Sequence, residues 1–353
     1  MSFLNIFKSK DNLVGSKVPK LPDNIGPWLN TSPINIKEAS KAGKIVLIDF
    51  WTYTCVNCLR TLPFLKHLFK KYARFGLIII GVHTPEFDFE KEQRHVENFL
   101  KNQNIKYPVI LDPEYRIWNA FANHGWPRKL LVDTKGKICF DHLGEGAYVE
   151  TEQKIREALQ KAYPDKKLPK MITKEHKHVG TDGTCYPQTP EVYCGYLRGT
   201  LGNPEGFKKD TFNIYKLGVI KNYIDGSIYL NGAWIATQNF LQHAVNTKDP
   251  LNYVTLPFHG LELNGVIKLD ETKSVKMTDT AKVYVDLDDQ PITEEFAGID
   301  IQYDKAGRSF IDIQEPRMYN LYRSNIYGYH KVKITPLSYA FQIYAFTFGG
   351  CVE

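Results

Sequence analysis

The chain has 353 residues, with 45 Lys or Arg against 39 Asp or Glu and a formal net charge of +6 at pH 7. Its length suggests two domains, and a hydrophobic fraction of 43% with a charged fraction of 24% excludes a wholly disordered chain. The charge is too small to indicate a nucleic-acid partner, and no apolar run is long enough to span a membrane.

The first segment, residues 1–40, is rich in Pro, Asn and Lys, which predicts an extended lead-in with room for one short strand. Its apolar run at residues 3–7 is too short for the core of a signal peptide. The lack of a signal peptide predicts a cytoplasmic protein.

Residues 41–165 alternate between strand-like and helix-like patterns. The nearly continuous apolar run at 44–50 is typical of a strand buried on both faces, and residues 59–72 carry an apolar stripe at helical spacing. Alternation of this kind predicts a mostly parallel sheet that ends in an antiparallel hairpin. The further elements are expected at 77–82 (strand), 90–101 (helix), 108–111 (strand), 114–123 (helix), 128–132 and 137–141 (hairpin strands) and 150–162 (helix).

A linker is predicted at residues 166–180. The run 161–177 holds six lysines and two prolines with a single aromatic residue, so a solvated linker is favoured over a nucleic-acid site. His176 and His178 lie in this polar segment, and we do not expect them to bind a metal.

The second half, residues 181–353, has the pattern of an all-β jelly-roll or sandwich domain. Short strand-like segments recur there, with turn residues between them. The strands are expected at 227–230, 254–256, 283–287, 309–313, 330–334 and 339–348, and turns at Asp225-Gly226, Asn231-Gly232, Asn264-Gly265 and Ala306-Gly307.

Cys55 and Cys58 form a C-x-x-C pair between the strand at 44–50 and the helix at 59–72. The thiolate is the attacking species in disulfide exchange, and a helix N-terminus supplies unpaired N–H groups that favour it. Cys58, one turn later, is expected to be more buried and able to resolve a mixed disulfide. The pair therefore predicts a dithiol redox centre that needs no cofactor.

Residues around the pair fit the same chemistry. Asp49 is a candidate base for Cys58, and Trp51 is expected to pack beside the two sulfurs and to help position a substrate. Pro127 follows Trp126 and is a candidate cis-proline that faces the cysteines, with both residues positioning a substrate chain. A zinc site is not expected, because the pair supplies only half of a tetrahedral ligand set.

The segment KIVLIDFWTYTCVNC, with Asp49, Trp51, the helix Pro63 and Trp126-Pro127, resembles the thioredoxin superfamily. The extra helix and strand between Thr84 and Leu111 are similar to its TlpA/ResA-type redoxin branch. Four further runs resemble the soluble part of DipZ-type proteins: GVHTPEF at 81–87, GEG at 144–146, TPEVYCGY at 189–196 and YAFTFG at 344–349.

The resemblance implies a thioredoxin-like domain joined to a β-sandwich similar to a carbohydrate-binding module. Its partners would be protein disulfides, an upstream thiol reductant and a carbohydrate. Such proteins usually begin with a CcdA-like membrane electron carrier, which this chain lacks, so its reductant stays open. The family's usual setting makes an extracytoplasmic location the alternative to the cytoplasm. Glu86 and Glu145 lie in family motifs and could tune the cysteines by charge repulsion.

Two other functions remain open. The second domain could bind carbohydrate or a partner while the first serves as a scaffold. A peroxiredoxin-like peroxidase is suggested by Thr52, three residues before Cys55, with Arg128 stabilising the peroxide. That pattern also needs a proline where Ile48 stands.

The remaining cysteines and the aromatic residues of the second half are expected mainly in the core. Cys185 and Cys194 could instead pair, since they are nine residues apart. Four aromatic residues could instead form a sugar platform: Tyr193, Tyr196, Trp234 and Tyr322.

Overall fold

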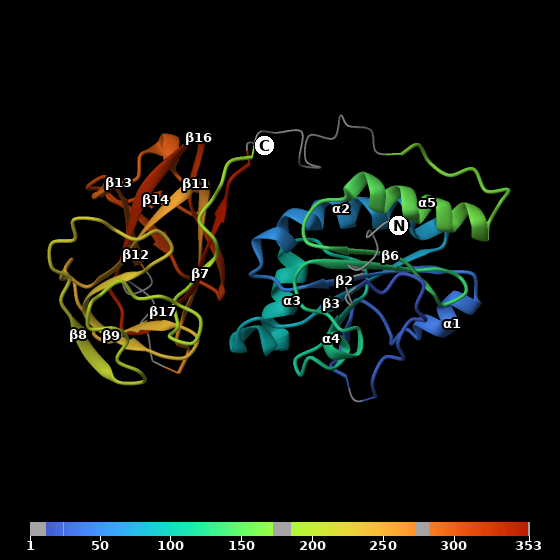
Figure 1. Ribbon diagram of the computed structural model, residues 1–353, viewed down its shortest axis with the longest axis horizontal. Helices are drawn as coiled ribbons and strands as arrows, with labels where there is room; N and C mark the ends of the chain where they lie inside the picture. Colours follow the sequence, from blue (N-terminus) through green and yellow to red (C-terminus); the bar gives the residue numbers. More distant parts are fainter. Residues whose placement is uncertain (1–11, 24, 172–184, 273–281, 352–353) are drawn as a thin grey trace, which may run out of the picture. The chain divides into compact units, whose positions relative to one another are not determined.

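The computed structural model describes residues 12–23, 25–171, 185–272 and 282–351, and the chain divides into two compact units, residues 1–180 and 181–353 (Figure 1). His176 and His178, and most of the predicted linker at 166–180, lie outside the described residues. Within the described residues no helix is both long and apolar enough to cross a membrane.

The first unit is built on a six-stranded sheet in the order β1-β4-β3-β2-β5-β6. The pairs β2–β3 and β3–β4 are parallel, whereas β1, β5 and β6 run antiparallel to their neighbours. The mostly apolar strands predicted from the sequence are thus confirmed as the centre of an α/β sheet. The strands are β1 Trp28–Leu29, β2 Ile45–Trp51, β3 Leu77–His83, β4 Val109–Leu111, β5 Arg128–Val132 and β6 Ile138–Leu143.

Helices cover both faces of this sheet (Figure 1). Every second residue of β2, from Val46 to Phe50, packs with Ile36 and Ile117 on the face of α1 and α4. Because side chains alternate along a strand, Asp49 points to the opposite face, where α2 and α5 lie. The helices are α1 Ile36–Lys41, α2 Val56–Tyr72, α3 Gln93–Asn102, α4 Arg116–Ala120 and α5 Tyr148–Ala162, with short 3₁₀ turns η1 Ala73–Phe75 and η2 Asp88–Lys91.

The sequence predicted an extended lead-in at residues 1–40, but this segment also contains helical structure near its end. Helix α1 lies within it, and the side chain of Asn35 caps this helix by accepting a hydrogen bond from the N–H of Glu38 at 3.2 Å. The helix predicted at 90–101 also begins later, because residues 88–91 form the 3₁₀ turn η2.

The second unit is all-β, as predicted. Its eleven strands in the described residues belong to one hydrogen-bonded sheet rather than to two separate sheets. The pairing of β11 with both β17 and β9, and of β10 with the same two strands, closes a small barrel to which the other strands attach. The strands are β7 Val192–Tyr193, β8 Phe212–Tyr215, β9 Tyr229–Ala236, β10 Leu241–His243, β11 Tyr253–Leu269, β12 Lys282–Leu287, β13 Gln290–Pro291, β14 Gln302–Tyr303, β15 Ser309–Asp312, β16 Arg317–Pro336 and β17 Phe341–Gly349, and η3 spans Glu294–Phe296.

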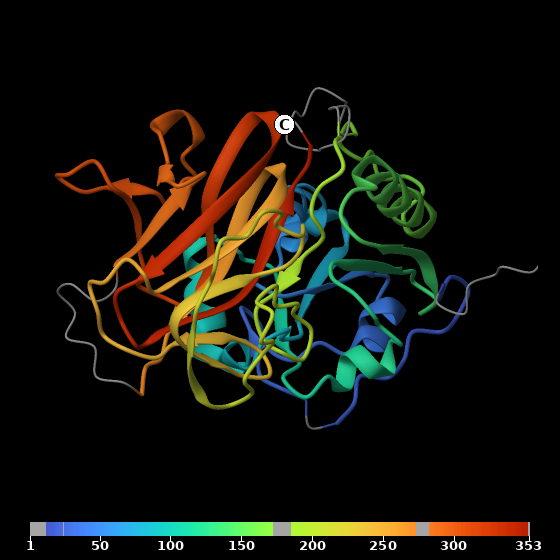
Figure 2. The same cartoon turned by 60° about the vertical axis from the view of Figure 1, so that its left-hand side comes forward.

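Two strands are much longer than the sequence suggested (Figure 2). β11 has 17 residues and β16 has 20, and the two pair along most of their length. The predicted turns at Asn231-Gly232 and Asn264-Gly265 are wrong, because these residues lie inside β9 and β11. A register shift between β11 and β16 at Asn264 takes the place of a turn.

The cysteines of the second unit differ in part from the prediction. Cys194 is fully buried, as expected of a core residue. Cys185 instead forms a disulfide with Cys351, 166 residues away, so the alternative pairing of Cys185 with Cys194 is wrong. This disulfide joins the two ends of the second unit.

Candidate active site

Cys55 and Cys58 lie where strand β2 passes into helix α2, as predicted. Cys55 is the N-cap residue of α2, and its sulfur accepts a hydrogen bond from the N–H of Cys58 at 3.2 Å. Cys55 is half-buried, whereas Cys58 is 1% exposed. One sulfur is therefore reachable at the helix start, and the other lies one turn deeper.

A buried carboxyl and a buried ammonium lie opposite each other on the adjacent strands β2 and β5. Asp49 and Lys129 are direct partners in the strand register, and each is almost fully buried. Burial raises the pKa of Asp49 to about 7, although the charge of Lys129 acts against this rise. Asp49 can therefore gain or lose a proton near neutral pH, and its Oδ1 atom has no hydrogen-bond partner.

Cys58 holds its proton more tightly than an ordinary thiol. Burial raises its pKa well above the usual value, and a hydrogen bond with the Cys55 thiol and the nearby charge of Asp49 raise it further. Tyr107 lies in the same electrostatic environment, because the charges of Asp49 and Cys58 add to the burial that raises its pKa. Removal of the Cys58 proton therefore needs a base.

A second buried carboxylate, Glu90, holds the loop that leads to Cys55. Its Oε1 atom accepts hydrogen bonds from the hydroxyls of Thr52 and Thr54 at 2.5 and 2.6 Å. Its Oε2 atom accepts from the backbone N–H groups of Glu86 and Phe87 at 2.6 and 2.9 Å. Burial raises the pKa of Glu90 to about 7 despite these four donors.

Trp51 lies wholly inside the protein, with its ring centre 5.1 Å from that of His83 and 5.7 Å from that of Phe99. The roles predicted for Trp51, packing beside the two sulfurs and helping to position a substrate, stay predictions. His83 is also buried, which lowers its pKa to about 3, so this imidazole is neutral in the ordinary pH range.

The peptide bond between Trp126 and Pro127 is cis, as the sequence predicted. The carbonyl of Pro127 accepts a hydrogen bond from the N–H of Gly144 at 2.7 Å. Trp126 is half-buried, and its ring centre lies 4.4 Å from that of Trp118. The roles of Trp126 and Pro127 in holding a substrate stay predictions.

The two glutamates expected to tune the cysteines also lie near other ionisable groups, and their effect on the cysteines stays a prediction. Glu86 donates its backbone N–H to Glu90, and its charge helps to raise the pKa of that carboxyl. Glu145 lies 3.8 Å from Arg60 of α2, and its charge acts on the pKa of Lys129. Both side chains are half-buried.

Arg128, the residue assigned to peroxide in the peroxiredoxin alternative, is 1% exposed. Its guanidinium makes a two-pronged ion pair with Asp141, at 2.9 and 2.7 Å. A buried guanidinium occupied in this way is not available to a peroxide, so nothing in this geometry favours the peroxidase.

Glu90 and Lys129 were missed in the sequence analysis, although each left a signal there. Lys129 is a charged residue inside the apolar strand 128–132, and Glu90 follows the alternating run Phe87-Asp88-Phe89. Charged residues in segments expected to be buried are costly unless paired, which marks them as candidates for a site.

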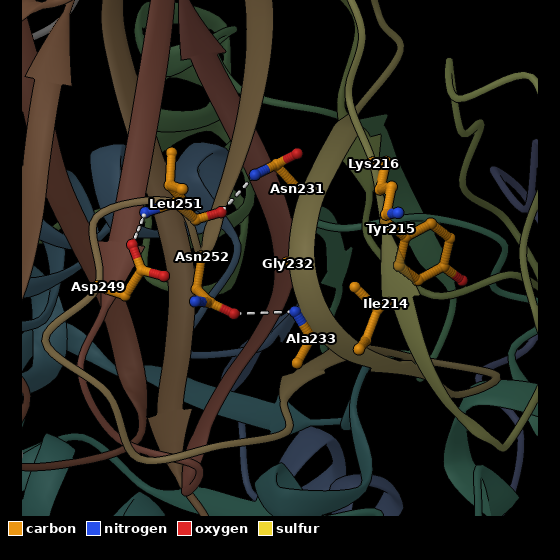
Figure 3. A pocket seen from close by; sticks show the side chains of 9 residues that line it. All are labelled: Ile214, Tyr215, Lys216, Asn231, Gly232, Ala233, Asp249, Leu251 and Asn252. Atoms are coloured by element: carbon orange, nitrogen blue, oxygen red, sulfur yellow. Dashed lines mark hydrogen bonds between the residues drawn. The ribbon is translucent and has the colours of Figure 1, made fainter.

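The second unit contains a shallow pocket of about 300 Å³ (Figure 3). Its amide groups bind the protein itself: Asn252 accepts from the N–H of Ala233 at 2.9 Å, and Asn231 donates to the carbonyl of Leu251. Tyr215, the aromatic residue among those lining it, is 1% exposed. Trp234 and Tyr322, expected either in the core or on a sugar platform, are fully buried, which confirms the core assignment for these two.

In the part of the chain that the structure describes, no three His, Cys, Asp or Glu side chains are grouped so that they could hold a metal ion. The two cysteines and the buried Asp49 are therefore our candidate reactive groups in the first unit.

Comparison with known families matches both units. Residues 43–138 match the family described as thioredoxin-like, and residues 189–349 match the family described as thioredoxin like C-terminal domain.

Individual relatives and one solved structure are similar to parts of the chain. The chain is 30% identical to the thiol-disulfide oxidoreductase ResA of Bacillus thuringiensis over 143 residues, which cover 40% of this chain and 76% of ResA. It is 43% identical to the protein DipZ of Mycobacterium bovis over 171 residues, which cover 48% of this chain but only 24% of DipZ. A crystal structure of a thiol:disulfide interchange protein DsbE from Chlorobium tepidum shares 25% identity, covers 41% of this chain and 98% of that one, and superposes with a TM-score of 0.35.

The C-x-x-C pair at the start of α2 and the ResA match agree on the first unit, and a separate family match covers the second. The chain belongs to the thioredoxin-like family, with a TlpA/ResA-type thiol-disulfide oxidoreductase domain followed by a thioredoxin-like C-terminal domain, and 171 of its residues are homologous to a region of DipZ.

Proposed function

We propose that this protein reduces disulfide bonds in protein substrates through the Cys55–Cys58 dithiol. The observation that carries the proposal is the N-cap geometry, in which the sulfur of Cys55 receives the N–H of Cys58 at 3.2 Å and stays partly accessible. A sulfur in this position carries negative charge more easily, because the free N–H groups and the helix dipole stabilise it.

In the first step the Cys55 thiolate attacks one sulfur of the substrate disulfide. A new S–S bond joins Cys55 to that sulfur, and the other substrate sulfur leaves as a thiolate that takes a proton from water. Trp126 and Pro127 are proposed to hold the substrate chain during this step.

In the second step Cys58 gives its proton to Asp49, through a water molecule, and attacks the sulfur of Cys55. The Cys55–Cys58 disulfide forms, and the substrate leaves fully reduced after receiving two electrons. The raised pKa of Cys58 supports this role for Asp49, because the thiol does not ionise unaided near neutral pH. An external dithiol must then reduce the protein for the next cycle.

The test is disulfide reduction in an insulin assay with matched cysteine variants. Cys55→Ser is expected to abolish activity, and Cys58→Ser is expected to accumulate mixed disulfides with the substrate. Cys139→Ser is the control, because this free, half-buried thiol donates to the carbonyl of Leu131 and takes no part in the mechanism. Full activity in the Cys55 variant would exclude the proposal.

The proposed direction is reduction rather than oxidation. The two residues between the cysteines, Val56 and Asn57, provide no His to stabilise a thiolate, and a less stable reduced form lowers the reduction potential. A measured potential above about −180 mV, the range of isomerases and oxidants, would reverse this direction.

An oxidising, extracytoplasmic compartment is proposed for this protein. The Cys185–Cys351 disulfide supports it, because disulfides between exposed cysteines rarely persist in a reducing cytosol. Alkylation of these two cysteines in intact cells, combined with fractionation, tests the location; a fully reduced pair in the cytosolic fraction would contradict it.

Carbohydrate is not among the partners that we propose. Two of the four aromatic residues of the suggested sugar platform lie in the core, and the pocket of Figure 3 has its amides engaged by the protein.

A further inference from the structure

The carboxylate of Glu90 connects two loops at the carboxyl ends of the neighbouring parallel strands β2 and β3. One oxygen holds the hydroxyls of Thr52 and Thr54, just after β2, and the other holds the N–H groups of Glu86 and Phe87, after β3. Ligand and reaction sites form at this edge of parallel sheets.

The loop held by Glu90 determines where Cys55 lies. Thr54 directly precedes Cys55, and the N–H of Cys55 turns back to the carbonyl of Thr52 at 3.4 Å. Two hydroxyl anchors within three residues leave this short segment little freedom. The His83 imidazole lies 3.3 Å from the hydroxyl of Thr52 and closes the other side of the loop.

This arrangement is costly for the fold. Glu90 is 1% exposed, and the cost of burying its charge is only partly offset by hydrogen bonds. Buried ionisable groups with raised pKa values are enriched at functional sites, and an apolar residue would fill the same space at a lower cost in stability.

We propose that Glu90 is a positioning residue for the redox centre: its four hydrogen bonds fix the loop of residues 52–54 so that the sulfur of Cys55 sits at the start of α2. The inference rests on the proposed function for its catalytic consequence, but not for its effect on the thiol itself. Displacements of about 1 Å at a reacting atom can lower rates a hundredfold, so a small loosening of this loop would be measurable.

The replacement Glu90→Gln distinguishes hydrogen bonding from charge. The amide oxygen of Gln can accept from the N–H groups of Glu86 and Phe87, and its NH₂ group can donate to the Thr52 and Thr54 hydroxyls, which can rotate. The Gln variant therefore keeps the anchors, whereas Glu90→Ala removes all four.

The experiment uses the full, reduced chain and measures the rate at which iodoacetamide alkylates Cys55, followed by mass spectrometry of the Cys55 peptide. Glu90→Ala is expected to lower this rate about tenfold, with kcat for disulfide reduction falling in parallel and KM unchanged within about twofold. Glu90→Gln is expected to stay within about threefold of the unmodified protein.

Glu152→Ala is the matched control. Glu152 is also fully buried and accepts from Lys71 and Tyr72, but these lie at the far end of α2 from Cys55. Its loss should lower stability and leave the alkylation of Cys55 unchanged. If Glu90→Ala behaves in the same way, Glu90 is only structural and the proposal is overturned.

Should Glu90→Ala fail to fold, the double variant Thr52→Val, Thr54→Val removes the same anchors from the loop side. It is expected to slow alkylation of Cys55 to a similar degree, and an unchanged rate would overturn the proposal. Alkylation of Cys55 needs no disulfide substrate. If the protein reduces no disulfide, the proposed function is refuted, but the alkylation rates still test the positioning role of Glu90.

Discussion

Replacing Asp49 by Asn removes a buried carboxyl group whose ionisation lowers the stability of the folded protein. The folded pKa of about 7, against an ordinary value of 3.8, means that the folded state keeps this proton when the unfolded chain has already lost it. Stability must therefore fall as pH rises through the window between these two values.

The size of the effect follows from the shift. A rise of about three pKa units at about 1.4 kcal/mol each corresponds to about 4 kcal/mol in total, of which about 3 kcal/mol develops between about pH 5 and pH 8.5. Asp49→Asn lacks this loss, so its stability relative to the unmodified protein should increase by about 3 kcal/mol over the same range. The contribution of Glu90 is common to both proteins and cancels in the difference.

The assay is urea unfolding at several pH values, followed by tryptophan fluorescence. Four of the five tryptophans belong to the first unit, so the signal reports mainly its unfolding. Lys129→Met provides a second measurement, because loss of the opposing ammonium should raise the pKa of Asp49 further and extend the fall in stability to higher pH. Parallel stability curves for the unmodified protein and Asp49→Asn would refute the reasoning.

Three further outcomes are expected. The stability of Glu90→Gln relative to the unmodified protein should increase by about 3 kcal/mol as pH rises from about 4.5 to above 7, because the raised pKa of Glu90 makes the unmodified protein lose stability over this range. Thermal unfolding at both pH values measures this difference, and a difference that does not change with pH would contradict it. Asp141→Asn should destabilise the first unit by about 3 kcal/mol, because it leaves the buried Arg128 without its counter-charge; a loss of less than about 1 kcal/mol in urea unfolding would argue against a strong pair. The double variant Cys185→Ser, Cys351→Ser should lower the stability of the second unit by about 4 kcal/mol, because the disulfide closes a loop of 166 residues; chemical unfolding of the second unit that is indifferent to a reducing agent would count against it.

The parts of the fold that depend on local pattern were predictable from the sequence. The apolar run of β2, the helical stripe of α2 and the apolar run of β3 were all found within a few residues of their observed ends. The lengths of β11 and β16 were not, because Asn-Gly pairs that usually mark turns lie inside long strands that long-range pairing holds together.

The candidate site divides in the same way. Cys55, Cys58 and the cis-proline after Trp126 are each recognisable from neighbouring residues, because the chemistry of a redox dithiol constrains a short stretch of chain. The partners that surround them come from distant segments, and residues 36–38 positions apart, such as Glu90 with Thr52 and Thr54, are joined only when β2 and β3 lie side by side.

By itself the sequence determined the two fold classes and the two sulfurs, since hydrophobic periodicity and a strand-to-helix C-x-x-C are local features. Only the tertiary structure decided that Lys129 faces Asp49, that Glu90 anchors the loop before Cys55, and that Cys185 bonds to Cys351. These contacts depend on strand register and on pairing between distant parts of the chain. The partner of a buried charge or thiol can therefore be identified only once the fold has brought the two residues together.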